Sequence, residues 1–332
     1  MSSLHAIYHP SVPSYLDQFL ALSSMQRLQD IGMNCGVEYT SLPFFKDLPK
    51  SSRYDHSLGV TLITAHFGGR KEAVLAGLFH DIATPCFAHV VDFLKNDHET
   101  QTSTEKATEE LLKNDPKLLE LLSLEGVSFE AIKDYSAYPL CDNPSPKLSA
   151  DRLEYTLRNL LYFGFANKET IAKLYNDLVF AENESGEQEL QFKHRETALT
   201  FANLTLKTSK VYVSDPDRFA MEDLAFVLKR AIERKNIKEE DLMETEPKLV
   251  QKLLSSEDSA SDWLTFRSLS DVKRVAETID HSYIIRPKLR YIDPYVQGLG
   301  RLSQIDSSFK KNLQDYLESD FSYRLGGVYS SR

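Results

Sequence analysis

The chain has 332 residues, with 39 Lys and Arg against 49 Asp and Glu, so its formal net charge is −10. This acidity argues against a protein that binds long nucleic acids, because such affinity rests on basic surface that releases phosphate counterions. The hydrophobic fraction of 42% and the charged fraction of 27% are typical of a globular protein with a large core.

The three cysteines favour a reducing environment. Cys35, Cys86 and Cys141 form no close pair and no CxxC motif, which is typical of a cytoplasmic protein without disulfides. No run approaches the roughly 18 consecutive apolar residues of a membrane span, and the first residues lack the apolar stretch of a signal peptide. We therefore expect a cytoplasmic protein that has no membrane partner.

Helical spacing of apolar residues dominates the first half of the chain. It predicts helices over residues 14–32, 54–67, 71–82, 85–96 and 147–163. The helix over 71–82 is apolar on nearly every side, which is typical of a helix at the centre of a bundle. Pro85 suits a first helical turn. The more polar stretch 101–143 is expected to form short surface helices.

The second half mixes helices with extended segments. Residues 178–193 read as a β-hairpin around a loop that contains Gly186. Helices are predicted over 196–214 and 216–235, and Pro287 within the extended stretch 282–292 suggests an edge strand. The fold class is therefore mainly α, a helical bundle with a small hairpin. We expect a catalytic core over 1–180 and an auxiliary, mostly helical lobe over 181–332.

A candidate metal site begins at His80 and Asp81, which end the apolar helix with two adjacent ligand-capable groups. Taken alone they also fit a histidine at a helix C-terminus and an aspartate that caps the next helix. His56, near the start of another helix, and Asp151, in the first turn of a third, add two more ligands. Two imidazoles and two carboxylates suit one divalent ion of the Mn, Fe, Co, Ni or Zn type better than Ca.

Downstream of this set lie further polar groups. His89 and Asp92 are three residues apart and share one helix face, so the carboxylate could orient the imidazole for general acid catalysis; a surface ion pair is the alternative. His98 stands in a polar stretch, where a solvated loop histidine is the alternative. His66 lies on the inner part of its helix and is expected to be structural.

These residues resemble a known family. The strings Arg53-Tyr-Asp-His56-Ser-Leu-Gly-Val, Gly77-Leu-Phe-His80-Asp81-Ile-Ala-Thr84 and Asp151-Arg-Leu-Glu-Tyr155 look like the HD-domain metal-dependent phosphohydrolases. Within that superfamily the chain is most similar to the deoxynucleoside triphosphate triphosphohydrolases, including the SAM and HD domain-containing type. The resemblance covers residues 9–163 and implies the HD-domain helical bundle.

The resemblance also implies roles for individual residues. It makes one divalent ion (Mn, Mg, Fe, Co, Ni or Zn) the cofactor, with four ligands, His56, His80, Asp81 and Asp151. It implies a catalytic group formed by the proton donor His89, its partner Asp92 and a further histidine, His98. The substrate-binding residues that it implies are Arg53 for phosphate, the basic Arg152, and Tyr155 on the sugar or phosphate side of the pocket.

Two departures keep the activity open. Thr84 stands where the triphosphohydrolases usually have a further histidine, and Asn159 stands where an aspartate is common. The first expectation is hydrolysis of a dNTP to deoxynucleoside and triphosphate. The alternatives are a phosphohydrolase for nucleoside monophosphates or cyclic nucleotides and a non-catalytic nucleotide sensor.

The expected partner is a small nucleotide rather than a long nucleic acid. Positive charge from Arg53, Arg152 and Arg158 is expected to be confined to the pocket, where it would admit a small anion despite the acidic chain. Relatives are commonly oligomeric, so the resemblance implies a homo-oligomer.

Overall fold

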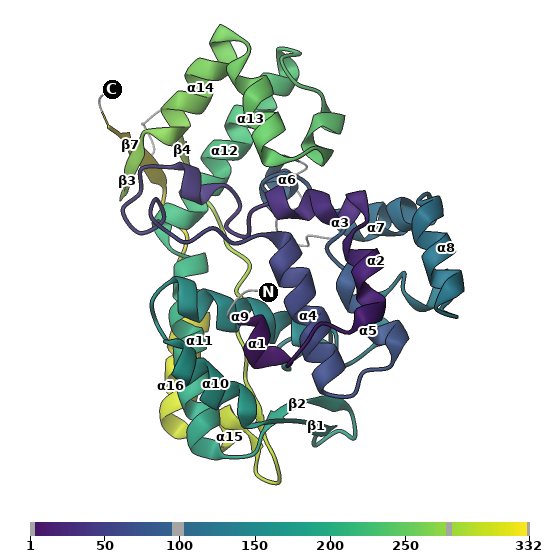
Figure 1. Ribbon diagram of the computed structural model, residues 1–332. Coiled ribbons are helices and arrows are strands. Elements are labelled where there is room, and N and C mark those ends of the chain that lie inside the picture. Colours follow the sequence, from purple (N-terminus) through teal and green to yellow (C-terminus); the bar gives the residue numbers. More distant parts are fainter. Residues whose placement is uncertain (1–3, 95–102, 277–280, 331–332) are drawn as a thin grey trace.

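The computed structural model describes residues 4–94, 103–276 and 281–330, and the chain is mainly helical (Figure 1). The helices of its first half are α1 (His5–Tyr8), α2 (Asp17–Leu20), α3 (Ser23–Arg27), α4 (Arg53–His66), α5 (Lys71–Phe79), α6 (Val90–Leu94), α7 (Ser103–Lys113), α8 (Pro116–Leu124) and α9 (Ala150–Tyr162). Short 3₁₀ turns join them at Ser14–Leu16, Leu28–Asp30, Val37–Tyr39, Phe129–Ala131 and Tyr135–Ala137. The predicted mainly α fold class is confirmed.

Helix α5 lies at the centre of the bundle, as its apolar sequence predicts, and every residue from Ala73 to Phe79 is buried. Helix α4 packs against α5 and α9. The approach of α4 to α9 depends on Gly59, since a Cβ atom there would lie 2.5 Å from Cγ of Glu154. Ser52 begins α4 by accepting a hydrogen bond from the backbone N–H of Asp55. These three helices fix the positions of the candidate site residues.

Two predicted helices are wrong in extent. The predicted helix over 14–32 is divided into short pieces, because Leu22 adopts an extended conformation (φ −58°, ψ 140°) between α2 and α3. The predicted helix at Pro85 begins only at Val90, because Phe87 and Ala88 have positive φ values of 60° and 46°. The described part of that segment ends at residue 94.

The second half holds the remaining helices and the strands. Its helices are α10 (Lys168–Asn176), α11 (Arg195–Tyr212), α12 (Asp215–Glu233), α13 (Glu246–Leu254), α14 (Glu257–Arg267), α15 (Leu302–Ile305) and α16 (Ser307–Leu317), with a 3₁₀ turn at Glu239–Met243. Its strands are β1 (Leu178–Glu182), β2 (Gln188–Phe192), β3 (Leu269–Arg274), β4 (Ser282–Tyr283), β5 (Tyr295–Val296), β6 (Gly300–Arg301) and β7 (Leu325–Tyr329).

The strands form two small sheets. The predicted hairpin is confirmed as antiparallel β1 and β2, which continue into a four-stranded sheet in the order β1-β2-β5-β6. The second sheet has the order β3-β7-β4. The predicted edge strand is correct in position but covers only Ser282–Tyr283, and the residues from 284 to 294 form no strand.

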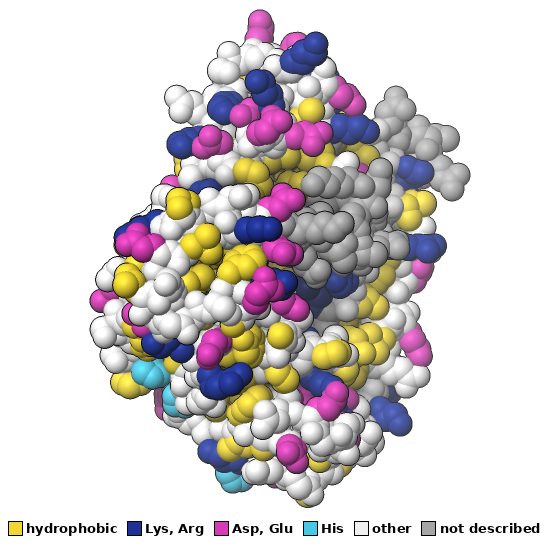
Figure 2. Space-filling model, turned by 90° about the vertical axis from the view of Figure 1, so that its right-hand side faces the viewer, with side chains coloured by type: hydrophobic (Ala, Val, Ile, Leu, Met, Phe, Trp, Pro, Cys, Tyr) yellow, Lys and Arg dark blue, Asp and Glu magenta, His cyan; other side chains and the backbone are white. Residues whose placement is uncertain are grey.

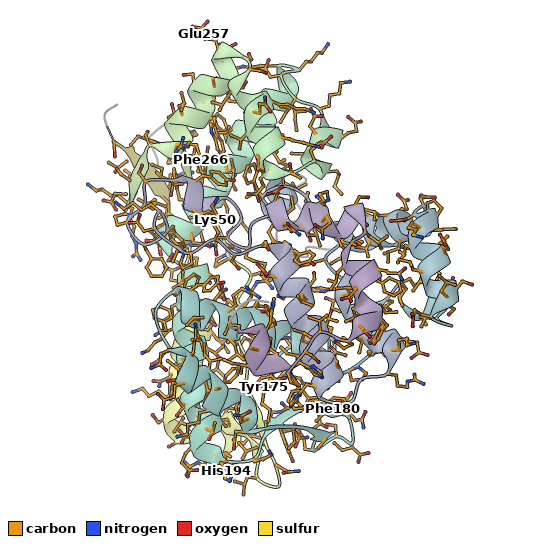
Figure 3. The ribbon with its side chains drawn as sticks, viewed as in Figure 1. Lys50, Tyr175, Phe180, His194, Glu257 and Phe266 are labelled. Atoms are coloured by element: carbon orange, nitrogen blue, oxygen red, sulfur yellow. The ribbon has the colours of Figure 1, made fainter. Side chains whose placement is uncertain are left out.

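The elements from α10 onward lie at two ends of the molecule (Figure 1). Helices α12 to α14 and the β3-β7-β4 sheet form the upper end, whereas α10, α11, α15, α16 and the hairpin form the lower end. His194, between β2 and α11, lies at that lower end, and Tyr175 lies in α10 (Figure 3). The Tyr175 hydroxyl donates to the backbone oxygen of Tyr8 at 2.9 Å, which ties α10 to α1. The division into 1–180 and 181–332 stays a prediction.

Acidic and basic side chains are interspersed with hydrophobic ones over the face shown in Figure 2. The three cysteines all lie in the described ranges, where they are buried free thiols. Within the described ranges, the helices are too short or too polar to cross a membrane.

Candidate metal centre

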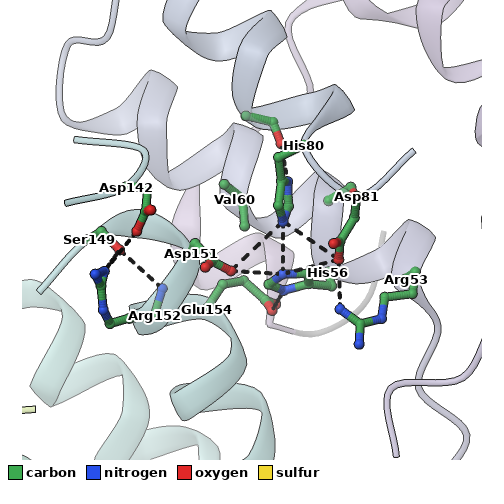
Figure 4. A network of polar contacts seen from close by, with 12 residues as sticks. Arg53, His56, Val60, His80, Asp81, Asp142, Ser149, Asp151, Arg152 and Glu154 are labelled. Carbon is green, nitrogen blue, oxygen red and sulfur yellow. Dashed lines mark hydrogen bonds and ion pairs between the residues drawn. The ribbon is translucent and has the colours of Figure 1, made fainter. Parts of the chain in front are cut away.

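The ends of three helices bring the candidate ligands together (Figure 4). His56 lies in the first turn of α4, His80 follows the last residue of α5, and Asp151 lies in the first turn of α9. The His56 Nε2 atom is 3.3 Å from His80 Nε2 and 3.1 Å from Asp151 Oδ1, and the His80 Nε2 atom is 3.8 Å from the same oxygen. Two nitrogens and one carboxylate oxygen therefore surround one point.

The other ring nitrogens fix the tautomers of both histidines. His80 Nδ1 lies 2.8 Å from the backbone oxygen of Gly77, and His56 Nδ1 lies 2.6 Å from Oε2 of Glu154. Both partners only accept hydrogen bonds, so each Nδ1 atom carries the hydrogen. The two Nε2 atoms are then directed at each other and at Asp151. This arrangement of imidazoles with oriented Nδ1–H groups is usual around protein-bound metals.

The electrostatics of the cluster also favour a cation. Burial opposes protonation of His56, but the Asp151 and Glu154 carboxylates outweigh it and raise the pKa of His56 to about 9. Burial likewise opposes ionisation of Asp151, whose pKa is lowered by the nearby imidazole of His56. The carboxylates therefore stabilise positive charge at this point, either a proton on His56 or a bound cation.

The donor set fits a divalent transition metal. His56, His80 and Asp151 each offer one ligand atom, and these atoms lie within 4.8 Å of one another. A cation that is roughly 2.0–2.2 Å from each donor fits such spacings, and a mixed imidazole and carboxylate set suits Zn, Mn, Fe, Co or Ni. These three residues form the candidate metal site of the chain.

Asp81 lies beside the candidate metal site, but its carboxylate also binds an arginine. Its Oδ2 atom is 3.6 Å from His80 Nε2 and 3.8 Å from His56 Nε2, but it also accepts a hydrogen bond from Arg53 at 2.8 Å. Burial would raise the pKa of Asp81, but the Arg53 guanidinium and the two imidazoles hold it well below its usual range. Thr84 donates to the second oxygen at 3.1 Å. The role of Asp81 as a fourth ligand stays a prediction.

A cavity of about 940 Å³ opens beside the cluster. Its lining includes the predicted residues Arg53, His56, His80, Asp81, His89, Asp151, Arg152 and Tyr155. Arg152 reaches Asp142 at 2.8 Å. Aromatic side chains from several elements also line the space, namely Phe45, Tyr135, Phe163, Tyr212 and Tyr291. The cavity lies within the usual range of small-molecule sites, roughly 300–1,000 Å³.

The expectation that Arg158 supplies positive charge to this pocket is wrong. The Arg158 side chain is fully buried and makes an ion pair with Glu154, which is fully buried as well. Because Glu154 also accepts from His56, Arg158 lies behind the metal ligands rather than in front of them. Its role is to neutralise the carboxylate that orients His56.

The predicted catalytic group is described only in part. His89 lines the cavity, and its Nε2 atom lies 3.5 Å from an Nη2 atom of Arg290. Asp92 belongs to helix α6, but its side chain is outside the described part of the chain, and His98 lies outside the described residues altogether. The catalytic roles of all three residues stay predictions.

The structure adds site residues that the sequence analysis did not select. Glu154 orients His56, and the Tyr135 ring lies 5.1 Å from that of His80. Glu154 stands three residues after Asp151 and four residues before Arg158. This spacing places the three side chains on one helix face and could have indicated the role of Glu154. The chain also places Arg286, Lys288 and Arg290 along the cavity. Their signal was a basic residue at every second position of a stretch that was predicted to be extended.

Comparison with known proteins identifies an HD domain in the chain. Residues 53–136 match the HD domain family. The chain is 26% identical over 247 residues to the uncharacterized protein YdhJ of Bacillus subtilis, which covers 74% of each chain. It is 28% identical over 207 residues to the metal-dependent phosphohydrolase cns2 of Cordyceps militaris, covering 62% of this chain and 58% of the relative.

Solved structures share the fold. A hypothetical protein from Aquifex aeolicus superposes with a TM-score of 0.68 at 17% identity, covering 96% of this chain and 93% of the other. A phosphohydrolase from Bacteroides thetaiotaomicron gives a TM-score of 0.66 at 14% identity, covering 97% of each chain.

The chain contains an HD domain over residues 53–136. This domain, the similarity to a metal-dependent phosphohydrolase and the candidate metal site support a metal-dependent hydrolase.

Proposed function

We propose that the chain hydrolyses a nucleotide phosphoester, with a deoxynucleoside triphosphate as substrate and deoxynucleoside and tripolyphosphate as products. The observation that carries the proposal is one cavity of about 940 Å³ that joins the candidate metal ligands to basic and aromatic side chains. Basic groups suit phosphate, and aromatic rings suit a base or sugar. The chain thus offers both kinds of contact that a nucleotide needs.

Each group has a distinct task in this proposal. A divalent ion, when bound, polarises a phosphoryl oxygen and lowers the pKa of a bound water. His56, His80 and Asp151 would hold that ion, and Glu154 keeps the Nδ1 proton of His56 in place. Arg53 lies at the cavity wall, oriented by Asp81. The proton donor to the leaving oxygen would be His89, which lines the same cavity.

The proposal is tested by product identity. Purified protein is incubated with each of the four dNTPs in the presence of Mn²⁺, Mg²⁺ or Co²⁺, and the products are separated by ion-exchange chromatography. We expect deoxynucleoside and tripolyphosphate in equal amounts, and no turnover with the Asp151→Asn variant. A metal-loaded wild-type protein that leaves all four dNTPs intact would reject the proposal.

A second substrate class is favoured by one specific observation. Thr84 stands where the triphosphohydrolases usually have another histidine, and its hydroxyl is engaged with Asp81 at 3.1 Å. With that imidazole missing, a nucleoside monophosphate or cyclic nucleotide is the alternative substrate. Orthophosphate released from dNMPs, with dNTPs left intact, would select this alternative.

A further inference from the structure

Tyr135 places a phenol ring against His80 at the wall of the cavity. It lies in the 3₁₀ turn Tyr135–Ala137, and its ring centroid is 5.1 Å from that of His80, with the ring planes tilted by 38°. Tyr135 also lines the cavity that opens beside the metal ligands. Within the described part of the chain, its hydroxyl has no hydrogen-bond partner. The group is therefore available to a ligand that enters the cavity.

Hydrogen bonds within its own loop fix the position of Tyr135. The Asp134 carboxylate accepts from the backbone N–H of Ser136 at 2.9 Å, which begins the turn. The Tyr138 hydroxyl donates to the backbone oxygen of Ala131 at 2.6 Å and closes the loop. The turn also packs against α5. The phenol ring is thus held in place before a ligand arrives, which lowers the cost of binding.

The Tyr135 hydroxyl is close to carboxylates of the candidate metal site. Burial raises the pKa of Tyr135, and the carboxylates of Asp151, Asp142 and Asp81 raise it further, in that order. A phenol of ordinary pKa is already protonated at neutral pH. The hydroxyl is therefore a neutral hydrogen-bond donor beside the metal ligands.

A neutral donor has an advantage at this place. The two arginines nearby already bind carboxylates, since Arg53 contacts Asp81 and Arg152 contacts Asp142, each at 2.8 Å. An arginine without such a partner would repel a metal ion, whereas a phenol does not. Phosphate oxygens are strong acceptors of hydrogen bonds. The Tyr135 hydroxyl therefore suits an oxygen of a ligand that is bound beside a cation.

We propose that Tyr135 is a further catalytic residue, whose hydroxyl donates a hydrogen bond to an oxygen of the phosphoryl group at the candidate metal site. This inference deepens the proposed function and rests on it for the identity of the substrate. The ligand chemistry that the hydroxyl recognises is a phosphate oxygen. The alternative is a packing role for the ring against His80, which would need no hydroxyl.

Tyr135→Phe tests the proposal, because it removes the hydroxyl and keeps the ring. The matched control is Tyr138→Phe, which removes a hydroxyl from the same loop but outside the cavity lining. Each full-length protein is titrated with Co²⁺, and the visible absorption of the bound ion gives the metal affinity. Sodium orthophosphate is then titrated into the Co²⁺-loaded proteins, and the change in the same absorption bands measures phosphate binding at the ion.

We expect Tyr135→Phe to bind Co²⁺ like wild type but orthophosphate at least about 10-fold more weakly, because one hydrogen bond to a charged oxygen is lost. Tyr138→Phe should have a lower Tm, since its hydrogen bond to Ala131 is lost, but should bind both ions like wild type. Equal phosphate affinities of wild type and Tyr135→Phe would overturn the proposal, and so would equal losses in the two variants. Wild type that binds no Co²⁺, or whose bound Co²⁺ does not respond to phosphate, would overturn it as well. A loss of Co²⁺ affinity in Tyr135→Phe would assign the residue to the support of His80 instead.

Turnover separates this outcome from that of the proposed function. With dNTPs as substrates, Tyr135→Phe should lower kcat/KM by at least about 10-fold, as expected for the loss of a donor to the reacting group. Weakened phosphate binding in Tyr135→Phe, with no turnover of any dNTP by wild type, would retain the hydroxyl contact and reject the triphosphohydrolase. Turnover of dNTPs with unchanged kcat/KM in Tyr135→Phe would do the reverse.

Discussion

Glu154 offers the sharpest test of how the metal ligands are supported. Its carboxylate accepts from His56 Nδ1 at 2.6 Å and from Arg158 Nε at 3.2 Å, and both Glu154 and Arg158 are fully buried. Burial would raise the pKa of Glu154, but the Arg158 guanidinium and then His56 lower it. Glu154→Gln keeps the shape of the side chain and removes its charge. The guanidinium then stays buried without its counterion.

Two losses are expected from this change. Breaking a buried ion pair costs about 3–5 kcal/mol of unfolding free energy, and the lower end applies because the amide oxygen still accepts one hydrogen bond. For a chain of this length, about 3 kcal/mol corresponds to roughly 4 °C in Tm. Metal affinity should fall by about 10–100-fold, because His56 loses the carboxylate that orients it. Thermal denaturation and metal titration measure the two effects.

Two further variants separate the causes. Glu120→Gln changes an exposed pair with Lys117 (3.0 Å) and should alter the unfolding free energy by less than about 0.5 kcal/mol. The double variant Glu154→Gln/Arg158→Met removes the stranded charge and should regain stability without regaining metal affinity. If Glu154→Gln matched wild type in both stability and metal affinity, the reasoning about this buried support would be refuted.

Three other predictions follow from particular residues. Asp151→Asn should reduce metal content by more than the roughly 10–100-fold expected for a supporting residue, as measured by elemental analysis after dialysis. Burial raises the pKa of Glu38 to about 7, so the folded state holds that proton more tightly than the unfolded state and stability falls as the pH rises from about 4.5 to 7. Glu38→Gln should therefore be more stable than wild type at pH 8 by about 3 kcal/mol, with little difference at pH 4.5, in urea titrations; equal gains at both pH values would contradict this. Gly59→Ala should destabilise the fold by about 1–3 kcal/mol and weaken metal binding, because its methyl group would displace Glu154. The control Gly77→Ala meets its nearest side-chain atom at 3.3 Å and should cost less in the same urea titration.

The helices that carry the metal ligands could be predicted from the sequence. Helices α4, α5 and α9 bury long periodic sets of apolar residues, and such sets define both the helix and its inner face. Their ends were accurate to within a few residues, and His56, His80 and Asp151 therefore fell at helix termini in the prediction as in the structure. For these three residues, the local spacing of apolar side chains was sufficient to predict their place at the helix ends.

Tertiary contacts explain the failures. In residues 14–32 the apolar side chains are buried as predicted, but the backbone turns at Leu22. The apolar pattern therefore indicated which side chains are buried, but not whether they belong to one continuous helix. After Pro85, the backbone N–H groups of Cys86 and Phe87 bind Leu242 and Glu246 instead of forming a helical turn. Partners this distant in sequence leave no periodic signal. The resulting irregular segment places His89 at the cavity.

Distance in sequence also explains why the sequence analysis did not identify all basic residues of the cavity. The sequence analysis gathered arginines that are close to the motifs in sequence, yet Arg53 and Arg158 each face a carboxylate of the same core. Arginines close to a bound cation need carboxylate partners, because an arginine without a counterion would repel the cation. Other basic residues of the cavity, Arg286, Lys288 and Arg290, come from the second half of the chain. They lie far in sequence from the motifs, so no local pattern connected them to the site.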